Sequence, residues 1–343
     1  MKTDIKSLTL PELKAAFAQY NYPGFRAKQV FDWLHKKRVS DFTEMQNIPI
    51  QMQKELVENF CIISLKIIKK LVSSMDHTVK YLYMLPDGEY IESVWMKYRY
   101  GNSLCISTEV GCKMGCTFCA STKQGFVRQL SPSEILEQIY MAEKDMGEKV
   151  SSIVLMGIGE PLDNFENVLQ FFTLLSCPEG LNMSLRHVTV STCGVVDKIY
   201  ELAEKNLQLT LSISLHAPND EIRSQTMPVN RKWNIEELLK ACRYYTHKTS
   251  RRISFEYALI RGVNDSRKNA EELAGRLKGM LCHVNLIPVN QIRESDYRAS
   301  TRANVYRFQE YLNQFGIQTT VRRTLGADIQ AACGQLRRDQ YKQ

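Results

Sequence analysis

The 343-residue chain lacks the long apolar runs that mark membrane proteins. No stretch approaches the roughly 20 consecutive apolar residues that a bilayer-spanning helix needs. The N-terminus leads into a polar helical pattern without an apolar core of the signal-peptide type, so we expect a cytoplasmic protein without a membrane partner. General disorder is excluded too, because 44% of the residues are hydrophobic and 24% are charged, as in ordinary globular proteins.

An extreme net charge is also lacking. The formal charge of +8 permits a polyanionic partner but does not require one. Basic residues gather at positions 35–38 and again in the last fifty or so residues, where Arg322-Arg323 and Arg337-Arg338 form pairs. Charge alone favours solvated helix surfaces slightly over phosphate-contacting faces, although both patches suit a nucleic-acid backbone.

The region before residue 96 combines helical and strand patterns. Residues 1–60 show apolar side chains at helical spacing. Strand patterns follow at 67–72, 79–85 and 90–96, with Pro86-Asp87-Gly88 as the turn between the last two. We therefore predict a small helical N-terminal accessory domain, with linking strands, over residues 1–95.

Beyond residue 96, strand and helix patterns alternate. Candidate strands lie at 104–107, 152–156, 186–191, 209–215, 253–259 and 282–287, and candidate helices at 133–145, 165–175, 196–205, 235–246, 266–277 and 302–315. Such units predict an α/β fold with a parallel sheet covered by helices. Since eight units close a barrel, six favour a partial (β/α)6 barrel, open on one side, over residues 96–343. The site is expected at the carboxyl ends of the strands.

Ten cysteines are many for a cytosolic protein, but a disulfide framework is not expected in so long a chain without a secretory signal. Scattered cysteines are typical of small buried residues. Cys112, Cys116 and Cys119 differ, because they share a CxxxCxxC pattern on the loop after the first barrel strand. Three thiolates at this spacing suit a soft metal or an iron–sulfur cluster.

Two kinds of metal centre are compatible with these three cysteines. A structural zinc site needs a fourth ligand, usually from a second pair, and no other CxxC or HxxxH pair occurs in the chain. A [4Fe–4S] cluster held by three cysteines keeps one iron open for a substrate or cofactor. The spacing, with Phe118 before the last cysteine, favours the cluster. An RNA-binding protein whose zinc is completed by a distant Cys or His stays as the alternative.

The run Cys112-x-x-x-Cys116-x-Phe118-Cys119 resembles the radical S-adenosylmethionine (SAM) superfamily, whose fold is the partial (β/α)6 barrel. Gly157-Ile158-Gly159-Glu160-Pro161, the later strand ends and the segment 327–336 narrow the resemblance to the RlmN/Cfr group of RNA adenine methyltransferases. The resemblance covers essentially the whole chain. It implies a [4Fe–4S] cluster on Cys112, Cys116 and Cys119, and SAM contacts from Gly159, Glu160, Ser191, Ser214, Leu215, His216 and Asn290.

The resemblance also implies three catalytic residues. Cys333 matches the cysteine that carries a methyl group, and a radical made from a second SAM would activate that group. Cys105 matches the cysteine that attacks the Cys333 sulfur, which forms a disulfide and releases the methylated base. Glu92 matches the base that removes the carbon-bound proton. Taken singly, Cys105 is more typical of a buried structural thiol, Cys333 of a small residue at a helix end, and Glu92 of a strand-surface carboxylate; the matched spacing reverses that order for the two cysteines.

The implied activity is methylation of C2 of adenine 2503 in 23S rRNA and of adenine 37 in certain tRNAs, with two SAM per turnover. A reductant such as flavodoxin or ferredoxin is the implied electron donor. The Cfr type, which methylates C8 of the same rRNA adenine, is the near alternative. Pro161 favours C2 methylation, because Cfr proteins usually carry Ala there. Nothing in the sequence indicates an oligomer, so we expect a monomer.

Overall fold

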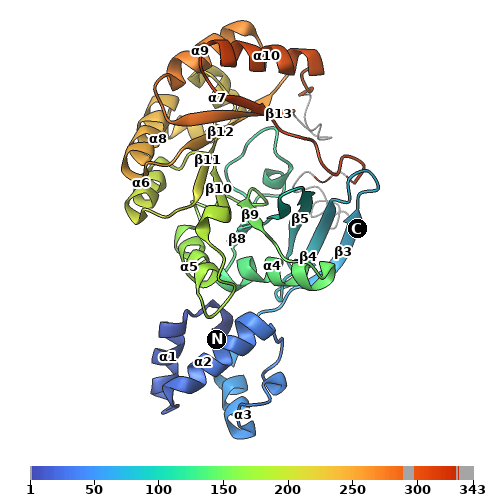
Figure 1. Ribbon diagram of the computed structural model, residues 1–343, viewed down its shortest axis with the longest axis vertical. Helices are drawn as coiled ribbons and strands as arrows, with labels where there is room; N and C mark the ends of the chain where they lie inside the picture. The colour runs from blue at the N-terminus through green and yellow to red at the C-terminus, as the bar shows by residue number, and fades with distance from the viewer. Residues whose placement is uncertain (1, 289–296, 330, 332–343) are drawn as a thin grey trace.

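A ten-stranded sheet forms the centre of the computed structural model, which describes residues 2–288, 297–329 and 331 (Figure 1). The strand order is β14-β13-β12-β11-β10-β9-β6-β5-β4-β3. Seven consecutive members of this order pair in parallel: β6 (Gly101–Cys105), β9 (Ser152–Leu155), β10 (Val188–Thr192), β11 (Thr210–Ser214), β12 (Ile253–Leu259), β13 (Cys282–Pro288) and β14 (Thr319–Val321). Between the described residues, β14 and β3 do not pair, so the expected open barrel is confirmed.

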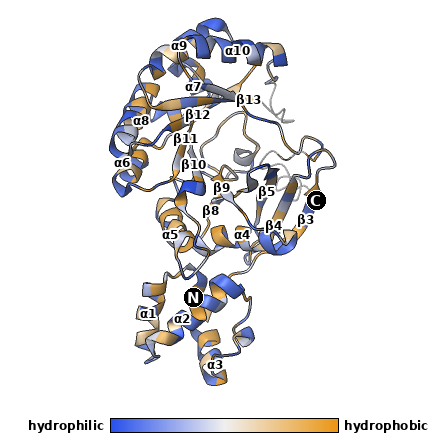
Figure 2. Cartoon of the chain, viewed as in Figure 1, coloured by the Kyte–Doolittle hydropathy of each residue, from blue (hydrophilic) through white to orange (hydrophobic). Residues whose placement is uncertain are grey.

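Helices cover the outer face of the parallel strands (Figure 1). They are α4 (Pro132–Met146), α5 (Phe165–Ser176), α6 (Val196–Lys205), α7 (Asp220–Thr226), α8 (Ile235–Thr249), α9 (Arg267–Leu277) and α10 (Arg302–Gln314). The central strands are mostly hydrophobic (Figure 2), and all seven residues of β12 are buried. Strands buried on both faces are typical of a parallel sheet. The short strands β7 (Glu109–Gly111) and β8 (Phe126–Gln129) form a separate antiparallel pair.

Three antiparallel strands extend the sheet beyond β6: β5 (Tyr90–Tyr98), β4 (Val79–Met84) and β3 (Lys66–Val72). The Pro86-Asp87-Gly88 turn joins β4 and β5 as predicted. The sheet thus runs across the division expected at residue 95, because β5 pairs with β6 and brings Val94 opposite Cys105. The helical unit itself ends before β3.

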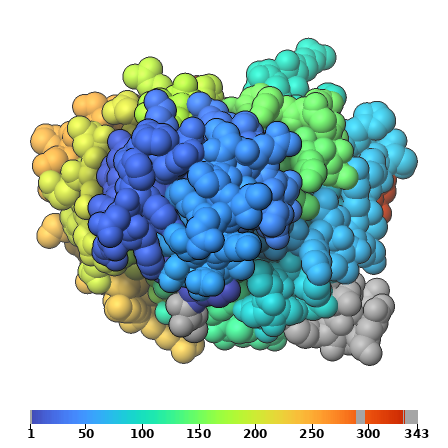
Figure 3. Space-filling view, turned by 90° about the horizontal axis from the view of Figure 1, so that it is seen from below, coloured from blue at the N-terminus to red at the C-terminus, as the bar shows by residue number. Residues whose placement is uncertain are grey.

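The helical unit consists of α1 (Leu10–Gln19), α2 (Gly24–Asp32), the π-helical turn Trp33–Lys37 and α3 (Ile50–Asn59). The two-residue strands β1 (Thr3–Asp4) and β2 (Phe60–Cys61) pair in parallel and close it. Seen from below, this unit covers the middle of the molecule (Figure 3). Its core is continuous with that of the barrel.

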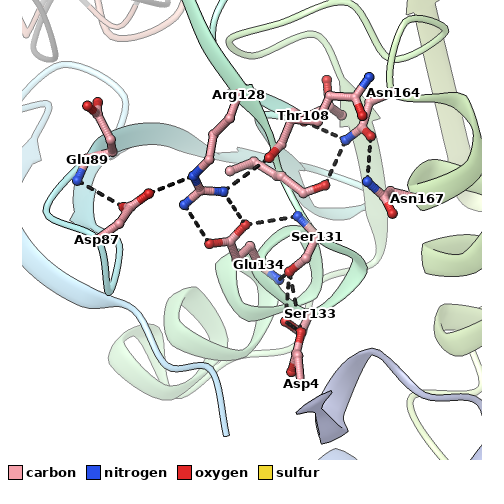
Figure 4. A network of polar contacts seen from close by, with 12 residues as sticks. Asp4, Asp87, Glu89, Thr108, Arg128, Ser131, Ser133, Glu134, Asn164 and Asn167 are labelled. Carbon is pink, nitrogen blue, oxygen red and sulfur yellow. Dashed lines mark hydrogen bonds and ion pairs between the residues drawn. The ribbon is translucent and has the colours of Figure 1, made fainter. Parts of the chain in front are cut away.

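Polar contacts join the helical unit to the barrel near the start of α4. Ser131 caps α4 and forms the predicted capping box with Glu134. Arg128 on β8 binds Glu134 and also Asp87 in the β4–β5 turn (Figure 4). Asp4 of the helical unit accepts a 2.5 Å hydrogen bond from Ser133. One network therefore fixes β8, α4 and the antiparallel strands relative to the helical unit.

Lys6 provides the most buried ionic link between the two units. Its ammonium lies 2.6 Å from a Glu137 carboxylate oxygen and also donates to the Ile63 carbonyl, with both charged side chains almost fully buried. Removing one partner of such a pair leaves a buried, uncompensated charge, which costs about 3–5 kcal/mol.

The variant Lys6→Met is therefore expected to lower the thermal unfolding midpoint of the protein by about 4 °C or more. Lys36→Met is the matched control, since its pair with Asp32 is solvent-exposed and spans 3.5 Å. Differential scanning calorimetry measures both. Equal midpoints for the two variants would contradict the role of Lys6.

Candidate active site

The loop that carries the three clustered cysteines is held by backbone contacts on both sides. The Cys112 amide donates to the Gly125 carbonyl (3.2 Å), and the Cys119 amide to the Cys116 carbonyl (3.1 Å). The Thr117 amide donates to the Thr226 carbonyl at the end of α7 (2.9 Å). Cys112, Cys116 and Cys119 all line one cavity of about 280 Å³. The three predicted cluster ligands therefore border the same cavity.

The chemistry of this donor set fits an iron–sulfur cluster. Burial raises the pKa of Cys116 to about 12 and that of Cys112 even further, so both are thiols until a metal displaces their protons. Within the described part of the chain, no three His, Cys, Asp or Glu side chains are grouped tightly enough to hold a single metal ion. A cluster spreads its thiolates over separate irons.

Most of the predicted SAM contacts line the same cavity: Gly159, Glu160, Ser191, Ser214 and His216. They lie at or after the carboxyl ends of β9, β10 and β11, as the parallel sheet requires. Leu215 is different, because its side chain packs in the hydrophobic core. Asn290 lies outside the described residues.

Glu160 is fixed by backbone amides. Its carboxylate accepts hydrogen bonds from the Cys193 amide (2.7 Å) and the Leu162 amide (3.0 Å), while burial raises its pKa. Gly159 beside it has φ +108°, and a Cβ added there would lie 2.6 Å from the Glu109 Cβ. Only glycine therefore fits where this loop crosses Glu109.

His216 is presented to the cavity in one tautomer. Its Nδ1 lies 2.9 Å from the Ala258 amide and accepts that hydrogen bond. Burial lowers the pKa of His216 to about 3, so the ring is neutral at pH 7. A neutral ring that accepts at Nδ1 carries its proton on Nε2. The ring packs edge-on against Phe118 of the cysteine loop, at 5.0 Å between centroids.

Arg223 on α7 ties the strand ends together, and the sequence analysis missed it. The guanidinium is fully buried and donates to the carbonyls of Cys193 (2.6 Å) and Leu215 (3.2 Å) and to the Asn230 side chain (3.0 Å). Among the described residues, it has no carboxylate in ion-pair range. Arg223 thus joins the loops after β10 and β11, the strands that carry Ser191 and Ser214. A buried basic residue in a short helix gave no sequence signal.

A second cavity adjoins the first and contains Cys105. The two cavities share four lining residues: Met156, Ile287, Pro288 and Arg322. Cys105 is buried against Val94 and Met96 of β5 and against Leu325 and Ala331 of the C-terminal segment. The nine described cysteines form no disulfide with one another. Cys333 itself lies outside the described residues, although Ala331 is only two positions away.

Glu92 lies on the same face of β5 as Val94 and Met96, because side chains alternate along a strand. Its carboxylate is 3.1 Å from the Lys80 ammonium, and both side chains are essentially unexposed. The predicted base is therefore a buried carboxylate beside the Cys105 cavity. Lys80, which the sequence analysis did not identify, compensates its charge.

Glu109 holds the loop that carries Gly159 and Glu160. Its Oε2 accepts from the Glu160 amide (2.9 Å), and its other oxygen faces the Asp163 carboxylate. Desolvation, assisted by Asp163, raises the pKa of Glu109 to about 8. Glu109 is thus protonated at neutral pH and can donate to Asp163, whose charge Lys113 compensates at 2.8 Å.

Comparisons with known proteins agree with this geometry. Residues 106–274 match the Radical SAM superfamily, and residues 3–62 match the ribosomal RNA large subunit methyltransferase N-terminal domain. A probable dual-specificity RNA methyltransferase RlmN from Clostridium botulinum (strain Okra / Type B1) is 54% identical over 98% of both chains. Its Clostridium tetani counterpart is 53% identical over 99% of this chain and 97% of its own.

A solved structure resembles the whole fold. The crystal structure of a radical SAM methyltransferase from Sphaerobacter thermophilus has a TM-score of 0.92 and 40% sequence identity, and the match covers 97% of this chain and 98% of that one. The similarity therefore includes the helical unit, the barrel and the antiparallel extension.

The raised pKa of Glu109 makes stability depend on pH. In the folded protein the proton stays bound up to about pH 8, whereas the ordinary glutamate value is 4.5. The stabilisation is complete below pH 4.5 and is lost as the pH rises through 8. Glu109→Gln is expected to flatten the decline in unfolding free energy between pH 5 and 8 by up to about 1.4 kcal/mol per pH unit. Urea titrations of the cluster-free protein at several pH values measure the unfolding free energy, and Glu58→Gln, at an exposed position, is the control. Equal pH dependence of the unfolding free energy in Glu109→Gln and the wild type would contradict the role of Glu109.

Proposed function

Because the chain belongs to the RlmN family of radical SAM dual-specificity RNA methyltransferases, we propose that it methylates C2 of adenine 2503 in 23S rRNA and of adenine 37 in tRNAs. The cofactors of this family are a [4Fe–4S] cluster and SAM. The observation that carries the proposal is the common wall between the cysteine-lined cavity and the Cys105 cavity. A methyl carrier held in the second cavity lies next to the radical source in the first.

The cavity of the three cysteines holds the cofactors in this proposal. Cys112, Cys116 and Cys119 bind the cluster, and Gly159, Glu160, Ser191, Ser214 and His216 surround SAM. When bound, the cluster and SAM supply the radical chemistry that an unreactive adenine carbon requires. The Nε2–H of His216 and the hydroxyls of Ser191 and Ser214 are donors that orient the polar groups of SAM.

Cys105 and Cys333 act as a pair. Ala331 lines the Cys105 cavity, and two further residues span at most about 7 Å, so Cys333 can reach it. Cys333 carries the methyl group, since a thiolate is a good nucleophile toward a sulfonium methyl. Once the carbon carried by Cys333 is bonded to adenine, the Cys105 thiolate attacks the Cys333 sulfur, the sulfur–carbon bond breaks, and the methyladenine leaves with a proton from solvent while a transient Cys105–Cys333 disulfide remains.

Glu92 removes the carbon-bound proton of adenine. The Lys80 ammonium lies 3.1 Å from the buried Glu92 carboxylate and balances its charge, while the carboxylate oxygens are the proton acceptor. The proposal favours C2 over the C8 position of Cfr enzymes because of Pro161, which follows the buried Glu160. A flavodoxin or ferredoxin is the proposed electron donor.

Nucleoside mass spectrometry tests the proposal. The protein is reconstituted anaerobically and incubated with SAM, a reductant and a 23S rRNA fragment, which is then digested. We expect 2-methyladenosine. The Cys105→Ala variant should instead accumulate a covalent protein–RNA adduct, because the attack that releases the base is lost. 8-Methyladenosine would assign the Cfr-type reaction, and the absence of any methylated adenine from a SAM-cleaving enzyme would refute the proposed substrate.

Arg322 and Arg323 are proposed RNA contacts. Both line the Cys105 cavity, and Arg323 is exposed to solvent while Arg322 is half-buried. Replacing both with Gln is expected to weaken rRNA-fragment binding and to reduce the slope of log Kd against log salt concentration by about 1–2. Filter binding at several salt concentrations measures this. Lys198→Gln, on the outer helix α6, is the control. An unchanged slope would remove these arginines from the interface.

A further inference from the structure

The turn between β3 and β4 is held by hydrogen bonds between its own residues. In this 73–78 turn, the Ser73 amide donates to the Thr78 carbonyl (2.8 Å), and the Ser73 hydroxyl accepts from the Met75 amide (3.1 Å). The Thr78 amide donates to the Asp76 carboxylate (3.0 Å). These bonds stabilise the turn and fix the directions of the Ser73 hydroxyl and the Asp76 carboxylate.

The C-terminal segment, residues 323–331, binds this turn through two aspartates, one from each side. The Asp328 carboxylate accepts from the Ser73 hydroxyl (2.6 Å), the Ser74 amide (2.9 Å) and the Ser74 hydroxyl (3.1 Å). In the opposite direction, the Gly326 amide donates to the Asp76 carboxylate (2.8 Å). The two partners are separated by about 250 positions in the sequence.

Gly326 makes this contact sterically specific. It has φ +60°, and an added Cβ would lie 2.6 Å from the Ala331 Cβ and 3.1 Å from Thr78 Cγ2. The segment turns back on itself there, because the Ala331 amide donates to the Gly326 carbonyl (3.0 Å). This bend at residues 326–331 thus places Asp328 against the 73–78 turn and Ala331 against Cys105.

These contacts are the polar anchors of the segment. Among hydrogen bonds between described residues, all those that join residues 323–331 to the rest of the chain go to Ser73, Ser74 or Asp76. The apolar anchors, Leu325 and Ala331, pack against Val94, Met96 and Cys105. Apolar packing is non-directional, so the hydrogen bonds fix the position of the segment along the cavity wall.

We infer that the 73–78 turn is a clasp that holds the C-terminal segment, up to Ala331, against the Cys105 cavity, and that the reaction between Cys105 and Cys333, two positions after Ala331 in the sequence, depends on this clasp. Asp76, Asp328 and Gly326 are its positioning residues. They touch neither substrate nor cofactor, and they act by raising the effective concentration of the Cys333 sulfur at its reaction partners. This inference deepens the proposed function and rests on it.

Disulfide equilibrium measures the clasp directly. Full-length, cluster-reconstituted protein is equilibrated anaerobically in glutathione buffers, thiols are trapped, and the Cys105–Cys333 peptide is quantified by mass spectrometry. The variants are Asp328→Ala and Gly326→Ala, and Asp87→Ala is the control, because it removes an aspartate from the neighbouring β4–β5 turn that binds Arg128 instead. We expect the effective concentration of the pair to fall about tenfold or more in both variants, since hydrogen bonds to a charged group contribute that much.

A second readout separates positioning from general loss of structure. The kcat of RNA methylation should fall to a similar extent in Asp328→Ala, whereas the KM for SAM should match that of the wild type. Asp87→Ala should leave the disulfide equilibrium unchanged. A disulfide equilibrium in Asp328→Ala that equals the control, or no Cys105–Cys333 disulfide in the wild type, would overturn the clasp.

The outcomes for the clasp and for the proposed function are distinguishable. If the variants weaken the disulfide while the wild type makes no methylated adenine, the clasp stands and the proposed substrate fails. If methylated adenine forms and the variants leave the disulfide unchanged, the proposed function stands and the clasp fails.

Discussion

The whole arrangement depends on the register between β5 and β6. Pairing of Val94 with Cys105 joins an antiparallel extension to an open parallel barrel, and it places Cys105 at the carboxyl end of the first barrel strand. Without the extension, Cys105 would end an edge strand and face solvent. With it, Cys105 lies in a walled cavity that shares Met156 and Arg322 with the cysteine-lined cavity. An open barrel permits this, because a closed one has no edge to extend.

Buried charge is handled differently on the two sides of the common wall. Beside Cys105, Glu92 and Lys80 compensate each other directly. Beside the clustered cysteines, Arg223 is satisfied by backbone carbonyls and Glu160 by backbone amides. A buried charge without such partners would be costly. Arg223 and Glu160 therefore fix the ends of β10 and β11.

Much of this was predictable because the relevant signals are local. Hydrophobic periodicity gave the alternating units, and α6 matches its expected bounds at 196–205. The CxxxCxxC spacing indicated the cluster loop. What could not be predicted depends on contacts between distant residues. Arg223, on a helix of seven residues, has no periodic signal. In the sequence Lys80 is typical of an ordinary strand residue. Its partner, Glu92, follows only from the register between β4 and β5. The antiparallel strands β3–β5 were grouped with the accessory domain because the pairing of β5 with β6 is likewise a contact that the sequence pattern does not reveal.

The central claim is that the methyl group passes through Cys333 beside Cys105 before it reaches the base. Mass spectrometry of the product made with SAM carrying a trideuterated methyl group tests it most directly. A group that is activated on Cys333 by loss of one hydrogen, and released by Cys105 with a proton from solvent, keeps two deuteriums in the methyladenosine. Retention of all three would contradict the account, because it would mean direct transfer of the intact methyl group from SAM to adenine.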